Sequence, residues 1–127
     1  MKQIGSAGAR LRGALEHERP LQVVGVINAY AALLAERSGF RAVYLSGAGV
    51  ANASFGLPDL GMTSLNDVCE DVRRISSATE LPLLVDADTG WGGAFNIART
   101  CRELIRAGDR SVSLPPDPRD ACRRHRP

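Results

Sequence analysis

The chain has 127 residues, of which 44% are hydrophobic and 24% charged, and its formal net charge at pH 7 is +2. This composition is typical of one globular domain or of a piece of a larger one. Residues 109–127 hold five arginines and three aspartates, so residues 1–108 carry no net formal charge and indicate no nucleic-acid or membrane partner. No apolar stretch approaches the ~20 residues that cross a bilayer, and no signal-peptide pattern opens the chain, so we expect a cytoplasmic protein.

The first part of the chain alternates helix and strand signals. Residues 7–18 predict a short helix, and residues 21–28 form an apolar run of strand length. Asn28 is placed to cap a helix that continues to about Ser38, with Gly39 just beyond it. Residues 41–46 predict a second strand, which leads into a small-residue loop at residues 47–49.

The alternation continues in the second part. Ser64 and Asp67 are spaced as a capping box at the start of a helix whose apolar residues recur at intervals of three and four. Residues 81–86 predict a third strand, and residues 94–107 a further helix that ends at Gly108. Cys69 and Cys101 fall on the apolar faces of these two helices, where we interpret them as packing residues.

This order of elements predicts an α/β fold with a parallel sheet and crossover helices. All three strands end in polar or glycine-rich residues, at positions 28, 46–49 and 86–93. That is the layout of a (β/α)₈ TIM-type barrel, which typically takes ~250 residues, so about three βα units make up a truncated N-terminal part of one. A flavodoxin-like open sheet is the alternative, although its usual Gly-rich phosphate loop is missing after the first strand.

Two acidic residues end the third strand, Asp86 and Asp88, and a glycine-rich run follows them. Alternation along a strand puts both carboxylates on one face, roughly 7 Å apart, where their repulsion favours a bound cation. Donors that are all oxygen favour Mg²⁺, with Mn²⁺ as the alternative, over zinc. A structural interpretation stays open, in which one aspartate caps a turn and the other is solvated.

Three segments of the chain occur in the same order in a known family. They are Tyr-Leu-Ser-Gly-Ala-Gly-Val at residues 44–50, Gly-Leu-Pro-Asp-Leu-Gly at 56–61, and Leu-Val-Asp-Ala-Asp-Thr-Gly-Trp-Gly-Gly-Ala-Phe-Asn at 84–96. Over residues 8–108 the chain resembles the 2-methylisocitrate lyases of the isocitrate lyase/phosphoenolpyruvate mutase superfamily. The resemblance implies a (β/α)₈ barrel, a homotetramer, and Mg²⁺-dependent cleavage of a small tricarboxylate, 2-methylisocitrate, to pyruvate and succinate in propionate breakdown.

The resemblance also implies which residues bind the metal and the substrate. Asp86 and Asp88 match metal-binding aspartates of the family. Ser46, Gly47 and Ala48 match the loop that holds the 2-oxo-acid portion of the substrate, and Ala48 stands where many relatives have glycine. Because alanine adds only a methyl group, this departure is mild.

Two further roles follow from the same resemblance. Asp59 matches an acid near the metal, and Tyr44, which points the same way as Ser46 along its strand, is a candidate base for the substrate hydroxyl. Structural alternatives stay open for Tyr44, for Asp59 and for Ser46. Tyr44 could be a packed barrel residue, Asp59 could stabilise a turn after Pro58, and Ser46 could cap the end of its strand.

The chain departs from the family after Gly108. Cleavage produces an enolate-like anion, which a divalent cation and oriented donors stabilise, and family members protonate the other fragment with a cysteine in a Lys-Arg-Cys-Gly-His loop after the fourth strand. Here Cys122, Arg123 and His125 stand in a different order, so we do not assign that role to Cys122. The prolines at 115, 116 and 118 exclude a central strand continuing there.

We therefore divide the chain into a partial barrel domain, residues 1–108, and an aberrant Arg-, Pro- and Asp-rich tail, residues 109–127, for which we expect disorder. Such a tail is typical of translation in a shifted reading frame, and the matching hypothesis is an inactive, truncated lyase that does not form the family homotetramer. Two alternatives stay open. One is another superfamily activity, on phosphonopyruvate or oxaloacetate, and the other is a non-catalytic fragment that associates with intact subunits.

Overall fold

The fold is built on a four-stranded parallel sheet. The structure is a computed structural model that describes residues 7–108 and 111–113. Strands β1 (Val23–Gly25), β2 (Ala42–Leu45), β3 (Leu83–Asp86) and β4 (Ser111–Ser113) lie side by side in chain order, and every neighbouring pair is parallel. The predicted α/β fold with a parallel sheet is confirmed.

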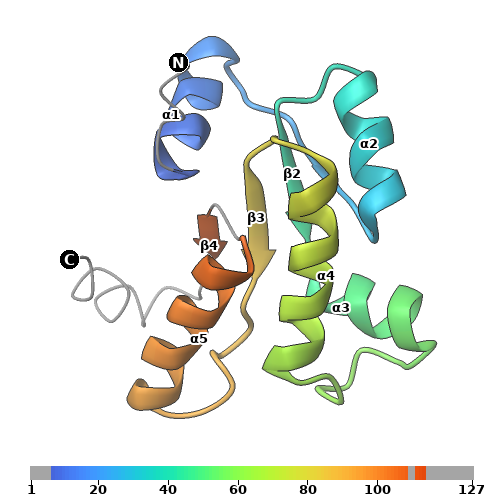
Figure 1. Cartoon of the computed structure of the whole chain (residues 1–127), viewed down its shortest axis with the longest axis vertical. Helices are drawn as coiled ribbons and strands as arrows, with labels where there is room; N and C mark the ends of the chain where they lie inside the picture. The colour runs from blue at the N-terminus through green and yellow to red at the C-terminus, as the bar shows by residue number, and fades with distance from the viewer. Residues whose placement is uncertain (1–6, 109–110, 114–127) are drawn as a thin grey trace.

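Helices connect the strands and cover one face of the sheet. They are α2 (Ala29–Arg37), α4 (Leu65–Ala78) and α5 (Ala94–Ala107), while α1 (Ala7–His17) precedes the first strand and a short α3 (Gly47–Gly49) continues into the π-helical turn η1 (Val50–Ser54). Figure 1 shows α4 between α2 and α5 in front of the strands, and α1 at the end where the strands begin. None of these helices is long and apolar enough to cross a membrane.

The core lies between the sheet and this row of helices. Val43, Leu45 and Val85 point from β2 and β3 toward the helices and are completely buried, as are Val72 on α4 and Leu104 on α5. Burying a side chain of this size stabilises the fold by about 1.5–3 kcal/mol. Alternate strand residues point to the opposite face, which therefore carries the side chains that remain available for binding.

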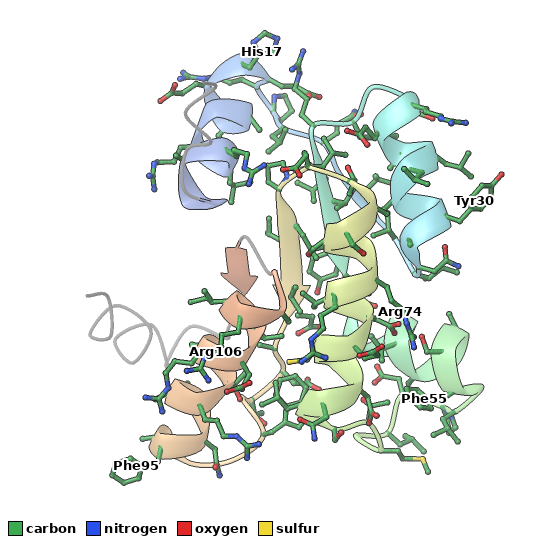
Figure 2. All side chains as sticks on the ribbon, viewed as in Figure 1. His17, Tyr30, Phe55, Arg74, Phe95 and Arg106 are labelled. Carbon is green, nitrogen blue, oxygen red and sulfur yellow. The ribbon has the colours of Figure 1, made fainter. Side chains whose placement is uncertain are left out.

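Two aromatic side chains are exposed at the end of the molecule where β3 terminates. Phe95, next to the start of α5, is 93% exposed, and Phe55, directly after η1, is 49% exposed. Figure 2 shows Phe95 projecting away from the start of α5.

Helix boundaries follow the capping residues that the sequence provides. The side chain of Asn28 accepts a hydrogen bond of 2.8 Å from the backbone N–H of Ala31, and Ser64 and Asp67 form the expected capping box. Gly108 ends α5 with a φ of 104°, a left-handed conformation that glycine adopts without strain. The predicted starts of α2 and α4 and the predicted end of α5 are confirmed.

Three elements were not predicted: α3, η1 and β4. Residues 47–54, expected to be a loop and the start of a longer connection, form α3 and η1, and Val50 and Ala51 at the start of η1 are buried. Strand β4 lies within the segment that we expected to be an aberrant tail, and its Ser113 pairs with Asp86. Residues 111–113 precede the prolines, so their backbone groups are free to join the sheet. Cys122, Arg123 and His125 lie outside the described residues.

Candidate metal and substrate site

Tyr44 and Asp86 meet at the carboxyl ends of β2 and β3. Tyr44 pairs with Leu84, and Asp86 follows Leu84 by two positions, so both polar side chains occupy the same face of the sheet. Burial, the charge of Asp86, a hydrogen bond to the Asp86 side chain and the charge of Asp88 together raise the pKa of Tyr44 above its usual 10.0. The phenol is therefore protonated at neutral pH, and three of the predicted site residues are close to one another.

Asp88 lies in a turn rather than on the strand. Strand β3 ends at Asp86, and Asp88 has a φ of 47°, which is uncommon outside glycine. Its N–H donates a hydrogen bond of 3.1 Å to Oδ1 of Asp86, while the N–H of Gly90 donates to the carbonyl of Ala87 at 2.8 Å. The expectation that both aspartates alternate along one strand is wrong, because this turn replaces the sheet pairing after Asp86. Asp86 thus caps the turn and Asp88 is exposed, as the structural interpretation expected.

The loop after β2 lies beside Asp88. A Cβ atom built on Gly47 would be only 3.9 Å from Oδ2 of Asp88. Ser46 accepts a hydrogen bond of 2.9 Å from the N–H of Gly49 through its hydroxyl oxygen, so it does cap α3, and its own proton remains free to be donated elsewhere. Gly47 and Ala48 are half-buried. The predicted substrate loop and the predicted metal residues are therefore neighbours.

Asp59 lies on the connection that follows η1. It is exposed, in the segment of residues 56–63 that connects η1 to α4. Between residues 7 and 108, no hydrogen bond or ion pair joins Asp59 to Tyr44, Asp86 or Asp88. The segment approaches the aspartate turn at another point, where Nε1 of Trp91 donates a hydrogen bond of 3.3 Å to the carbonyl of Thr63.

Two residues of α5 that the sequence analysis did not select hold the glycine-rich loop. The hydroxyl of Thr100 donates a buried hydrogen bond of 2.9 Å to the carbonyl of Gly90. Ile97 packs so closely on Gly90 that a Cβ atom there would lie 2.6 Å from its Cγ1. The available sequence signal was a threonine beside Cys101 on the buried side of an amphipathic helix, where an apolar residue is usual.

The donor set fits a small, hard cation. Asp86 and Asp88 offer carboxylate oxygens and Tyr44 a phenol, and Mg²⁺ is commonly held by one or two carboxylates together with substrate and waters. No ion pair involves either aspartate within the described part of the chain, nor does that part contain a cluster of three His, Cys, Asp or Glu residues. A divalent cation would supply the missing positive charge and leave coordination positions for a substrate.

Comparison with known proteins identifies close relatives. A family model described as phosphoenolpyruvate phosphomutase matches residues 11–118. A 2-methylisocitrate lyase from Shewanella oneidensis is 67% identical over 109 residues, which make up 86% of this chain and 37% of the relative. The chain spans roughly a third of the length of the curated relatives that it matches.

Solved structures agree with this match. A 2,3-dimethylmalate lyase, described as a PEP mutase/isocitrate lyase superfamily member, has a TM-score of 0.76 and 36% identity, over 87% of this chain and 40% of its own. A phosphonopyruvate hydrolase in complex with oxalate and Mg²⁺ has a TM-score of 0.79 and 27% identity, over 97% of this chain and 49% of its own. These neighbours are TIM barrels, which confirms the predicted partial barrel. The chain therefore belongs to the PEP mutase/isocitrate lyase family.

Proposed function

We propose that this chain provides the metal-binding and 2-oxo-acid-binding part of a 2-methylisocitrate lyase, which cleaves 2-methylisocitrate to pyruvate and succinate with Mg²⁺. The convergence of Tyr44, Asp86, Asp88 and the loop at residues 46–48 on one edge of the sheet carries the proposal. The 67% identity to a 2-methylisocitrate lyase supports this substrate. We propose the activity for a whole protein of the relatives' length.

In this proposal Asp86 and Asp88 hold Mg²⁺. When bound, the cation supplies positive charge that stabilises the enolate-like anion formed as the carbon–carbon bond breaks. The residues of the chain orient the substrate. The loop of Ser46, Gly47 and Ala48, next to Asp88, offers a hydroxyl and backbone N–H groups for the carboxylate of the 2-oxo-acid portion, and such fixed donors cost no reorganisation during the reaction.

In the same proposal Tyr44 contacts the substrate hydroxyl. Its raised pKa makes it a proton donor while Asp86 and Asp88 are both charged and uncompensated. A role as the base requires that the charge of the two aspartates is neutralised, because their field is among the causes that hold the proton on the phenol. The role of Asp59 as an acid near the metal stays a prediction.

Manganese binding to the 127-residue chain tests the metal site. Isothermal titration with Mn²⁺ should show one site, and oxalate should tighten it, since oxalate resembles the planar anion of a 2-oxo acid. Asp86→Asn and Asp88→Asn should each abolish binding. Glu103→Gln, which removes an α5 carboxylate that pairs with Arg106, is the matched control and should bind as the parent does. Absent binding, or binding kept by both Asn variants, would contradict the proposal.

The substrate is tested on the whole protein. Assays with 2-methylisocitrate, phosphonopyruvate and oxaloacetate should show turnover of the first alone. Turnover of phosphonopyruvate would instead favour the activity named for the phosphonopyruvate hydrolase. Turnover of oxaloacetate would favour that of another structural neighbour, an oxaloacetate acetylhydrolase with a TM-score of 0.77 and 35% identity. The homotetramer and the cytoplasmic location stay predictions for the whole protein.

A further inference from the structure

We propose that Thr100 is a positioning residue that fixes the turn carrying Asp88, and that it thereby sets the affinity of the site for a divalent cation. The first part rests on the geometry of the turn, and the second part rests on the proposed metal-binding function. Thr100 lies on α5, ten residues beyond Gly90, and is remote from the aspartates in the sequence.

The turn at residues 87–90 needs support from outside. Asp88 has a left-handed φ of 47°, and Gly90 has a φ of 81°. A non-glycine residue in this region of conformational space persists when the surrounding structure determines its backbone. Within the turn, the N–H of Gly90 is bonded to the carbonyl of Ala87, and the N–H of Asp88 to the side chain of Asp86. The carbonyl of Gly90 is left for a partner from another element.

Thr100 supplies that partner. Its side chain is completely buried, and its hydroxyl donates to the Gly90 carbonyl at 2.9 Å. A threonine inside a helix often bonds to a carbonyl of its own preceding turn, so a bond to a loop is a specific arrangement. Ile97 closes on the Cα of Gly90 from the same helix. Gly90 is thus held through its N–H, its carbonyl and its Cα.

The helix that provides this clamp is itself anchored. Leu104 and Ala107 of α5 belong to the main hydrophobic core. Thr100 and Gly90 therefore fix the backbone of Asp88 relative to the hydrophobic core. Partners that orient metal ligands without touching the metal typically change metal affinity by about 10–100-fold when they are removed.

Thr100→Val tests this role because valine has the shape of threonine without the hydroxyl. Thr100→Ser keeps the hydroxyl and should restore the parent behaviour. Thr79→Val is the matched control, since Thr79 is also buried (5% exposed) and donates a hydrogen bond of 2.9 Å, to Glu36, at the opposite edge of the sheet. All three variants are made in the 127-residue chain.

Hydrogen exchange of the Gly90 amide, measured by NMR, reports on the turn with no metal present. We expect it to be about tenfold faster in Thr100→Val, the factor that corresponds to one lost hydrogen bond. The Val85 amide of β3 should be unchanged. Thr100→Ser and Thr79→Val should both leave the exchange of Gly90 as in the parent. Unchanged Gly90 exchange in Thr100→Val, or equal acceleration in Thr79→Val, would overturn the positioning role.

Affinity for Mn²⁺ tests the second part. Thr100→Val should bind Mn²⁺ at least about tenfold more weakly than the parent and Thr100→Ser. Equal affinity in the parent and Thr100→Val, with faster Gly90 exchange in the variant, would overturn the link to the metal. A parent that binds no Mn²⁺ would overturn the metal site and that link together, while the exchange data would still decide the positioning role.

Discussion

The charged side chains at the two edges of the sheet, where the strands begin and where they end, differ in whether they have bonded partners. At the edge where the strands begin, Arg10 of α1 forms an ion pair with Glu80, and Thr79 donates to Glu36. At the edge where the strands end, Asp86 and Asp88 lie beside Tyr44, and no Arg or Lys within residues 7–108 pairs with them. At the first edge Glu80 and Glu36 each have a partner within the chain, whereas at the second edge the two aspartates lack a cationic partner in the described residues, which is typical of a binding site.

Replacing one glycine by alanine at each edge should produce the largest difference between the two edges in the free energy of unfolding. Gly39 and Gly90 both have positive φ angles, of 89° and 81°. Gly39 has open space around a Cβ, but a Cβ on Gly90 would lie 2.6 Å from Ile97. We expect Gly39→Ala to lower the free energy of unfolding by about 1 kcal/mol and Gly90→Ala by about 3 kcal/mol. Urea unfolding measures both values, and equal losses would show that the aspartate edge is not tightly packed.

Removing one charge should lower the free energy of unfolding at the edge where the strands begin, but not at the edge where they end. Arg10→Met removes the ion pair with Glu80 but keeps the apolar stem, and Glu80 is 73% exposed, so the loss should be below about 1 kcal/mol. Asp86→Asn relieves the repulsion from Asp88 and keeps an oxygen for the Asp88 N–H, so it should leave stability unchanged or slightly higher without metal. A clear loss of stability in Asp86→Asn, in the same urea experiment, would contradict the comparison.

The smallest expected effect is the loss of folding stability at alkaline pH that follows ionisation of the Tyr44 phenol. Its pKa is raised in the folded chain, so the folded state holds this proton more tightly than the unfolded state does. The resulting stability is present below pH 10.0 and is lost as pH rises through the folded pKa. We expect Tyr44→Phe to lose less stability than the parent above pH 10.0, with Tyr30→Phe as the control. Parallel pH profiles of the parent and Tyr44→Phe would count against the contact with the aspartates.

The sequence predicted those elements whose signals are local. Asn28, the pair Ser64 and Asp67, and Gly108 mark helix ends through short-range hydrogen bonds or backbone conformation, and the structure has helix ends at these positions. These features depend on neighbouring residues alone, so one sequence is enough to find them.

The elements that the sequence did not predict depend on distant contacts. Residues 47–49 contain two glycines, which are poor helix formers, and the helical segment formed by α3 and η1 is anchored by the burial of Val50 and Ala51 in η1. Strand β4 has three residues and exists through pairing with β3. The conformation of Asp88 and the bond from Thr100 to Gly90 require α5 to pack against the loop. A pattern of residue types does not encode such distances.

Thermal unfolding with and without Mn²⁺ tests the central claim, that a divalent cation supplies the charge missing from the aspartate edge. A ligand at 100 times its dissociation constant stabilises the folded state by about 2.7 kcal/mol. The account predicts that Mn²⁺ raises the Tm of the parent and of Arg10→Met, and leaves the Tm of Asp86→Asn unchanged. An equal rise in the parent and Asp86→Asn, or no rise in the parent, would contradict it.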